Sequence, residues 1–304
     1  MSAKTPPPDA LVNPRAVVVE NMPVARDTHR IRIADPTLAR RLRPGQFVMI
    51  RTGAEGASDP LLGRPLALYD VQTDAAGAPA SFDLVYLVIG RGTASLAGRR
   101  PGDRLSVWGP LGNGFGPPPG TGPVLFVAGG IGQTPFLALG RDWLGTATYG
   151  EPSLGARNRI ESATLLYGAR TADLLAGVDD FRAAGIDVEV ATDDGSAGHR
   201  GFVTDLLAAR LQRGERPAKV LACGPPVMLA AVARLTERFG VPCDVSLENH
   251  MACGFGACFS CVAPILQDDG QPDLRRVCVE GPVFPADRVD WSEVARGHAP
   301  AGAP

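Results

Sequence analysis

The sequence lacks the features that would place it in a membrane, outside the cell or on nucleic acid. Its apolar runs, such as PVLFVAGGIG and KVLACG, are shorter than the about 20 residues of a membrane-spanning helix. The N-terminal MSAKTPPPDALVNPR has no apolar core followed by a small-residue cleavage site, as a secretory signal would. With 30 basic and 32 acidic residues, the net charge of −2 gives no general attraction to polyanions. We therefore expect a cytoplasmic protein.

Cysteine is sparse and unevenly distributed. The 304 residues contain six cysteines, and cytoplasmic thiols stay reduced, so a disulfide framework is not expected. Four of the six lie close together near the C-terminus, whereas Cys223 and Cys243 stand apart. The close group indicates a metal site, and an isolated thiol such as Cys243 is most simply structural.

The length and texture of the chain predict three regions of a multidomain β plus α/β protein. Six short alternating runs between about Val12 and Phe115, separated by Gly, Pro and Asp turns, predict a small antiparallel barrel. After the Pro-rich hinge at residues 117–122, strands alternate with helices, which predicts a parallel sheet covered by helices. From about Val245 the sequence is rich in Cys and Gly. We place the boundaries at 1–118, 119–244 and 245–304, with a flexible arm over 1–12 and a disordered tail from Arg296.

The clustered cysteines have the spacing of an iron–sulfur site. Cys253, Cys258, Cys261 and Cys278 are separated by four, two and sixteen residues, and this opening spacing is typical of plant-type [2Fe–2S] sites. Small residues between them allow backbone N–H groups to approach the sulfur atoms. Zinc also takes four thiolates, but its ligands usually come in pairs two residues apart, and only Cys258 and Cys261 have that spacing. We therefore predict a [2Fe–2S] cluster, with zinc as the alternative.

Three weaker motifs point to phosphate-bearing cofactors. Arg64 at a strand end, with Gly92 and Thr93, could bind a flavin pyrophosphate, although without the other motifs an ordinary exposed barrel arginine is the favoured interpretation of Arg64. The glycine turn in VLFVAGGIGQTP joins a strand to a helix, as phosphate-binding turns do, but lacks the full GxGxxG pattern. CGPPVM, from Cys223, places Gly and Pro at another strand end, where open α/β sheets bind ligands.

Taken in order, these motifs resemble the ferredoxin-reductase superfamily over residues 15 to 291: PGQFV, RPLA, GRGT, GPLGNGF, AGGIGQTP, YGAR, DDGSAGHRG and CGPP. Within that family, SLENHMACGFGACFSCV followed by RVCVEGPVF is similar to the electron-transfer subunits of NAD-dependent (class 1B) dihydroorotate dehydrogenases. The resemblance implies an FAD-binding barrel, an NAD-binding domain and a C-terminal [2Fe–2S] segment.

The resemblance also implies a set of cofactor-binding residues. FAD would be lined by Arg64, Pro65, Leu66, Ala67, Val85, Tyr86, Leu87, Gly92 and Thr93. The nicotinamide nucleotide would be bound by Gly129, Gly130, Gly132, Thr134, Cys223, Gly224 and Pro225. The chain departs from the family at two positions, since Ala67 stands where a serine hydroxyl is usual and His250 where an arginine is usual.

The resemblance implies that electrons pass from an FMN-containing, dihydroorotate-oxidising partner subunit through the cluster and FAD to NAD⁺, in a heterotetramer with two copies of each subunit. No Ser-His-Asp grouping or carboxylate pair suggests acid–base catalysis, so the cofactors are expected to carry the chemistry. An alternative is a reductase subunit serving a ferredoxin, a hydrogenase-like complex or another pyrimidine dehydrogenase. A third possibility, from another class, is a zinc-stabilised nucleotide-binding interaction module. NADP is left open, because Arg170 follows a strand as a 2′-phosphate ligand would.

Overall fold

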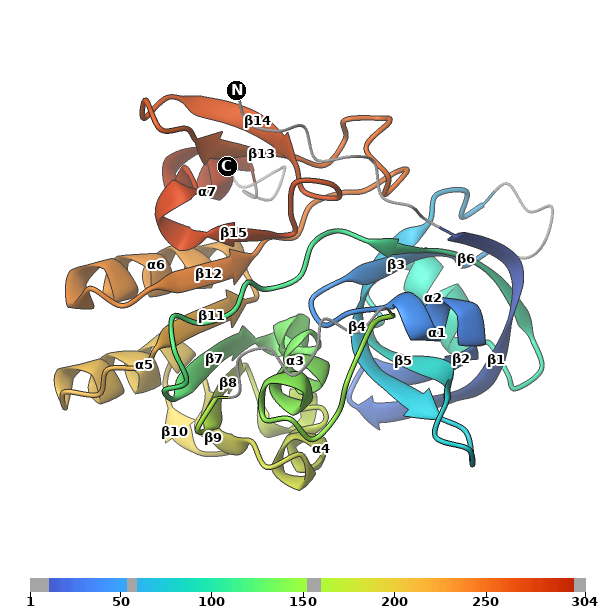
Figure 1. Cartoon of the computed structure of the whole chain (residues 1–304), viewed down its shortest axis with the longest axis horizontal. Helices are drawn as coiled ribbons and strands as arrows, with labels where there is room; N and C mark the ends of the chain where they lie inside the picture. Colours follow the sequence, from blue (N-terminus) through green and yellow to red (C-terminus); the bar gives the residue numbers. More distant parts are fainter. Residues whose placement is uncertain (1–10, 54–58, 152–159, 298–304) are drawn as a thin grey trace.

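The computed structural model describes residues 11–53, 59–151 and 160–297, with side chains described to Val294. Within these ranges the molecule has a barrel, an α/β layer and a small C-terminal segment that rests on both (Figure 1). In this part of the chain, no helix is both long and apolar enough to span a bilayer. The sequence favours surface loops over residues 52–63, which are rich in Gly and Ala, and over residues 146–161. Both stretches lie partly outside the described residues, as does most of the tail predicted from Arg296.

The barrel closes from six antiparallel strands in the order β1-β2-β5-β4-β3-β6. Alternation of buried and more exposed side chains explains why such segments form strands. In β6 every second residue is buried, as a half-buried strand should show. The strands are β1 (Leu11–Ala25), β2 (Thr28–Ala34), β3 (Phe47–Arg51), β4 (Arg64–Thr73), β5 (Pro79–Leu87) and β6 (Arg104–Leu111). This confirms the predicted barrel. β1 begins two residues inside the segment expected to be an arm, because Leu11 and Val12 pair with β6.

Two short helices in the barrel region were not predicted, namely α1 (Pro36–Arg41) and α2 (Arg91–Ala97). At the start of α1 the Asp35 carboxylate accepts a hydrogen bond from the Leu38 N–H, and Pro36 occupies the first turn, where its missing N–H costs nothing. At α2 the Thr93 hydroxyl accepts hydrogen bonds from the Ile89 and Gly90 N–H groups. Local caps therefore form both helices despite their shortness.

The α/β layer contains a seven-stranded sheet in the order β10-β9-β8-β7-β11-β12-β15, parallel except for the edge strand β15. Its strands are β7 (Val124–Gly129), β8 (Ala163–Ala169), β9 (Asp187–Thr192), β10 (His199–Arg200), β11 (Lys219–Cys223), β12 (Cys243–Ser246) and β15 (Val283–Pro285). The central strands β7 and β11 are buried almost throughout, as expected for parallel strands covered on both faces. The predicted parallel sheet is confirmed.

Helices pack on this sheet, and a small hairpin completes the C-terminal segment. The helical elements are η1 (Gly130–Gln133), α3 (Phe136–Trp143), η2 (Ala172–Leu174), α4 (Val178–Ala183), α5 (Val203–Gln212), α6 (Pro226–Phe239), η3 (Ala286–Arg288) and α7 (Trp291–Gly297). The hairpin pairs β13 (Val262–Leu266) with β14 (Pro272–Arg276). Arg296 and Gly297, expected to begin the tail, end α7 instead.

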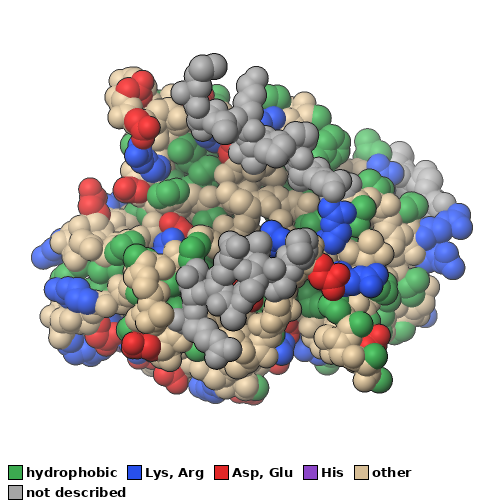
Figure 2. Space-filling model, viewed as in Figure 1, with side chains coloured by type: hydrophobic (Ala, Val, Ile, Leu, Met, Phe, Trp, Pro, Cys, Tyr) green, Lys and Arg blue, Asp and Glu red, His purple; other side chains and the backbone are tan. Residues whose placement is uncertain are grey.

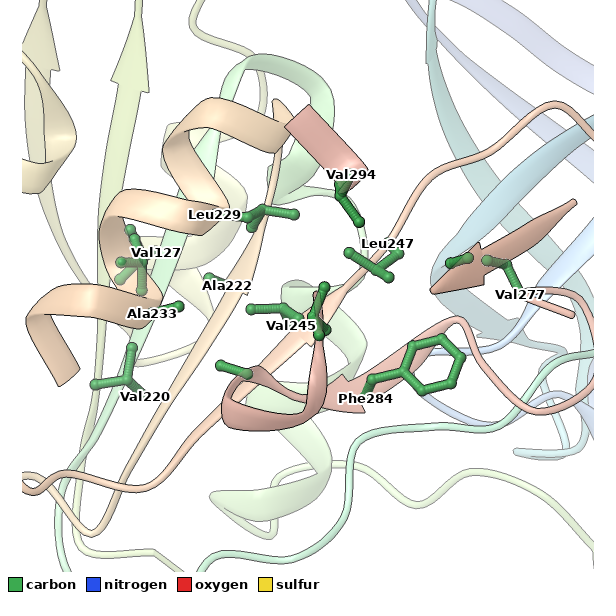
Figure 3. Close-up of a cluster of buried hydrophobic side chains, with 14 of the residues drawn as sticks. Val127, Val220, Ala222, Leu229, Ala233, Val245, Leu247, Val277, Phe284 and Val294 are labelled. Carbon is green, nitrogen blue, oxygen red and sulfur yellow. The ribbon is translucent and has the colours of Figure 1, made fainter. Parts of the chain in front are cut away.

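One apolar core joins all three regions. Figure 3 shows Val127 and Ala222 of the sheet facing Leu229 and Ala233 of α6, next to Val245. The same core reaches side chains of the C-terminal segment and of the barrel: Leu247, Cys261, Val277, Cys278, Phe284, Val294, Phe47, Met49 and Leu111. Burial of this continuous surface positions the C-terminal cysteines relative to the barrel.

The charged surface is uneven between the two larger regions. On the face shown in Figure 2, arginine and lysine side chains predominate over the barrel, at the right, whereas acidic and basic side chains are mixed over the α/β layer. The net charge of the whole chain is only −2. Electrostatic recognition therefore depends on local groups, as the sequence suggests.

Candidate redox site

The four clustered cysteines lie on two adjacent stretches of the C-terminal segment. Cys253, Cys258 and Cys261 lie in the loop between β12 and β13, and Cys278 follows β14. The N–H of Val277 donates to the carbonyl of Cys261 at 2.8 Å, which brings the two stretches together.

This arrangement fits the ligand set of an iron–sulfur cluster. A [2Fe–2S] cluster requires four thiolates, two on each iron. The C-terminal segment can supply all four, because three cysteines of one loop lie beside a fourth that follows β14.

The environments of the four thiols differ. Cys261 and Cys278 are buried, whereas Cys258 is exposed. Hydrogen bonding by Ser260 lowers the pKa of Cys258 to about 6. The hydrogen bond between Cys261 and Cys278 lowers the pKa of Cys261 and raises that of Cys278. Thiolates bind iron, so the lowered pKa values of Cys258 and Cys261 suit these two side chains to act as ligands.

The cysteine loop rests directly on the barrel. Gly254 has φ +79°, and a Cβ atom there would lie 2.5 Å from Cγ of Met49 in β3, so only glycine fits this approach. The indole N–H of Trp108 in β6 donates to the carbonyl of Cys253 at 2.9 Å. His250, the departure noted in the sequence, is exposed at the start of this loop.

Part of the predicted flavin set also comes together. A Cβ atom at Gly92 would lie 3.1 Å from Nε of Arg64, so the guanidinium group lies directly against the start of α2. Arg64 donates to the carbonyls of Leu62 and Gly63, and within the described ranges it forms no ion pair with a carboxylate. A half-buried arginine that lies beside glycine fits a pyrophosphate group.

Other members of that set have different surroundings. The Thr93 hydroxyl donates to the carbonyl of Gly90, so it is engaged within the turn. Along β5, Val85 packs against the α/β layer, whereas Tyr86 points into the barrel and its hydroxyl donates to Asn21. Pro65, Leu66 and Ala67 lie half-buried in β4, and Leu66 and Ala67 pair with β3.

A pocket of about 630 Å³ opens between the barrel and the carboxyl ends of the parallel strands. Gly129, Gly130, Gly224 and Pro225 of the predicted nucleotide set line it, together with Leu87 of the predicted flavin set. Such strand ends are where open α/β sheets bind ligands.

Three predicted nucleotide residues lie behind the pocket wall. A Cβ atom at Gly132 would lie 2.2 Å from the carbonyl oxygen of Cys223, so this glycine allows η1 to pack on β11. Thr134 is buried. Cys223 is buried too, and burial raises the pKa of its thiol. These residues shape the pocket without lining it.

Sequence reasoning missed several lining residues. They come from segments far apart in the chain: Thr28, Tyr167, Asp193, Phe202, Val227, Met228 and Glu248. Phe202 and Val227 remain 66% and 71% exposed, which is unusual for large apolar side chains and suits contact with a planar ring. The only sequence signal for Phe202 and Val227 is that each lies a few residues after the end of a strand.

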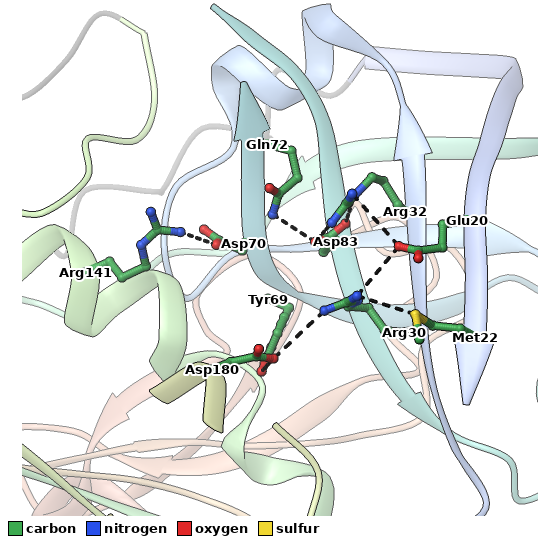
Figure 4. Close-up of polar contacts among 10 residues, drawn as sticks. All are labelled: Glu20, Met22, Arg30, Arg32, Tyr69, Asp70, Gln72, Asp83, Arg141 and Asp180. Atoms are coloured by element: carbon green, nitrogen blue, oxygen red, sulfur yellow. Dashed lines mark hydrogen bonds and ion pairs between the residues drawn. The ribbon is translucent and has the colours of Figure 1, made fainter. Parts of the chain in front are cut away.

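Polar contacts fix the barrel against the α/β layer (Figure 4). The Tyr69 hydroxyl donates to Asp180 at 2.7 Å, and Arg141 forms an ion pair with buried Asp70. The Tyr149 hydroxyl also donates to Asp70, at 2.6 Å. The pocket is therefore bounded by two regions held in a defined arrangement.

Two family models match the chain. Residues 248–290 match the iron–sulfur cluster binding domain of dihydroorotate dehydrogenase B, and residues 126–234 match an oxidoreductase NAD-binding domain. These ranges contain, respectively, the four clustered cysteines and most of the nucleotide pocket.

Curated relatives are similar over nearly the whole chain. The electron transfer subunit of dihydroorotate dehydrogenase B (NAD(+)) from Desulforamulus reducens is 36% identical, covering 88% of this chain and 94% of the relative. The corresponding subunit from Geobacillus thermodenitrificans is 37% identical, covering 90% and 97%.

Solved structures are also similar to this chain. A chain of the NADH-dependent reduced ferredoxin-NADP oxidoreductase, studied for flavin-based electron bifurcation, has a TM-score of 0.73 and 31% identity, covering 93% of this chain and 92% of that one. The ferredoxin reductase of carbazole 1,9a-dioxygenase, at TM-score 0.59 and 22% identity, covers 77% and 67% and shows the shared fold. The chain belongs to the family of electron transfer subunits of dihydroorotate dehydrogenase B, within the ferredoxin-reductase fold.

Proposed function

We propose that the chain transfers electrons between a dihydroorotate-oxidising partner subunit and NAD⁺, for pyrimidine biosynthesis. The observation that supports this most strongly is that a loop with Cys253, Cys258 and Cys261 lies beside Cys278 and against the barrel. The same segment matches an iron–sulfur cluster binding domain, which a zinc-stabilised binding module would not explain. The four thiolates would hold a [2Fe–2S] cluster.

FAD would bind on the barrel between the cluster loop and the pocket. Arg64 and the backbone at Gly92 would hold its pyrophosphate, and β4 and β5 would flank its ring. When bound, FAD exchanges a hydride with nicotinamide and single electrons with an iron–sulfur cluster, which is why this chemistry needs all three groups. With alanine at position 67, the side chain there can offer the flavin no hydrogen bond.

The pocket would hold the nicotinamide nucleotide. Phe202 and Val227 offer apolar surface for a ring, and the backbone at Gly129 and Gly130 lies where a phosphate approaches a strand end. Arg170 and Asp193 also line the pocket, and they would have opposite effects on a 2′-phosphate. We propose NAD⁺ as the acceptor because the family relatives are NAD(+) enzymes.

The partner would dock over the cysteine loop. Cys258 is exposed there, between Phe255 and Phe259, which are 47% and 59% exposed. Aromatic side chains are favoured in interface cores. We propose that this face contacts an FMN-containing catalytic subunit, in a heterotetramer with two copies of each chain.

Replacing Cys278 with Ser tests the route. C278S removes one buried ligand, so dihydroorotate-dependent reduction of NAD⁺ by the reconstituted complex should be lost, whereas NADH-to-dye activity, which needs only FAD, should persist. Cys243→Ser is the matched control, because Cys243 lies apart from the cluster. Coupled transfer that survives C278S would contradict the proposal. Parallel assays with NADP⁺ would determine the nucleotide preference.

A second candidate follows from the similarity to the ferredoxin-NADP oxidoreductase chain. In that case the cluster would exchange electrons with another acceptor, such as a ferredoxin. Reconstitution distinguishes the two: a complex with cluster and flavin that forms no NADH from dihydroorotate, yet reduces ferredoxin with NADH, would favour this alternative.

A further inference from the structure

Arg276 contacts three parts of the cysteine site. It ends β14, two residues before Cys278, and its Nη1 donates to the carbonyl of Gly256 at 3.2 Å. Its guanidinium group lies over the ring of Phe259, 5.1 Å from the centroid. Phe259 has φ 57°, an unfavourable conformation for a bulky residue that needs support from its surroundings. Arg276 therefore holds the middle and the C-terminal part of the loop between Cys253 and Cys261.

Glu280 holds Arg276 in that position. Its carboxylate lies 2.5 Å from Nη2 of Arg276 and accepts a further hydrogen bond from Nε at 3.1 Å. It also accepts from the backbone N–H of Arg276 at 2.8 Å. Both side chains are only partly exposed, at 26% and 19%.

The pair thus places one positive and one negative charge two residues on either side of Cys278 in the sequence. The positive group also lies against the loop that carries Cys258, at Gly256 and Phe259. The neighbouring Arg275 differs, because its guanidinium lies 3.1 Å from Asp273 and donates to Gln267, on the hairpin.

We propose that Arg276 and Glu280 are a positioning pair that holds the cysteine loop and sets the reduction potential of the [2Fe–2S] cluster. The inference rests on the proposed binding of that cluster by the four cysteines. Reduction adds one negative charge to the cluster. A nearby positive charge therefore favours the reduced form and raises the potential, and a nearby negative charge lowers it.

This predicts opposite effects for two conservative substitutions. Arg276→Gln leaves the negative charge of Glu280 uncompensated, two residues after Cys278, so the midpoint potential should fall. Glu280→Gln keeps a hydrogen-bond acceptor for Arg276 but removes the negative charge, so the potential should rise. In the double variant both charges are gone, and the potential should return close to that of the wild type.

The experiment is a redox titration of the full chain loaded with iron, sulfide and FAD, followed by the electron paramagnetic resonance signal of the reduced cluster. Arg275→Gln is the matched control, because it removes the same charge one residue away without touching the loop. Iron release to a chelator is measured alongside. Arg276→Lys keeps the charge but cannot make every contact, so it should keep the potential near the wild-type value and release iron several-fold faster.

Shifts of R276Q and E280Q in the same direction, or shifts no larger than that of R275Q, would overturn the inference. If R276Q does not retain its cluster, the other two variants test the inference. The potential of E280Q should rise, and that of R276K should stay near the wild-type value. Failure of the proposed function looks different: the wild-type chain itself would then bind no cluster, and the inference would fall with it.

Discussion

At the scale of single residues, Trp108 connects the barrel to the cysteine loop. Its indole N–H donates to the carbonyl of Cys253 at 2.9 Å, and a Cβ atom at Gly63 would lie 2.5 Å from its ring. The side chain is therefore fixed on both sides. It joins the proposed flavin region to a proposed cluster ligand.

Trp108→Phe should loosen the loop without disturbing the barrel. The variant keeps an aromatic ring but loses a hydrogen bond of about 1 kcal/mol, so the cluster should release iron to a chelator several-fold faster. Trp291→Phe is the control, because Trp291 also donates to a carbonyl at 2.9 Å, that of Ala286, away from the loop. Equal release rates in the two variants would show that the Trp108 hydrogen bond does not hold the loop.

At this scale, the spacing of the four cysteines alone predicted that they bind one cluster, because a cluster imposes its ligand pattern on a short stretch of sequence. The contacts of Arg276 could not be foreseen. They depend on the path of the loop around Phe259, which has an uncommon positive φ that no local pattern indicates. Thr28 and Phe202 were missed in the pocket for a similar reason, since they meet only when the barrel packs on the sheet.

At the scale of elements, the long regular strands were predictable and the short helices were not. Alternating side chains identified all six barrel strands, whereas α1, α2 and α4 are too short to show a helical period. The hairpin β13–β14 was missed because Pro264 and Pro272 fall within its two short strands, and proline weakens a strand signal. There, packing into the shared core rather than local propensity determines the structure.

At the same scale, the packing of η1 against β11 depends on Gly132. Gly132→Ala would place Cβ 2.2 Å from the backbone oxygen of Cys223, which cannot move easily. Overpacking of this kind costs about 1–3 kcal/mol, so the variant should unfold at lower denaturant concentration and bind nucleotide more weakly. Gly122→Ala is the control, because its Cβ would make ordinary contact at 3.5 Å. If G132A is as stable as G122A, the turn is not fixed by this packing.

At the scale of the whole molecule, function depends on how the barrel and the sheet are held around the pocket. Asp70 is central, because it is buried in the barrel and receives Arg141 and Tyr149 from the other region. Burial, followed by the charge of Asp70, raises the pKa of Tyr149 well above its ordinary value of 10.0. The phenol is therefore a proton donor throughout the neutral range.

Tyr149→Phe removes this donor while Arg141 still neutralises Asp70. Hydrogen bonds to charged groups contribute about 1.5–3 kcal/mol, so the variant should be less stable by about that amount in urea unfolding. Because the folded-state pKa of the phenol is raised, its contribution is fully present below pH 10.0 and is lost as the pH rises further. The stability difference between wild type and Y149F should thus be constant from about pH 6 to 9 and shrink in more alkaline buffer. A difference that already varied between pH 6 and 9 would mean that another group controls how the two regions are joined.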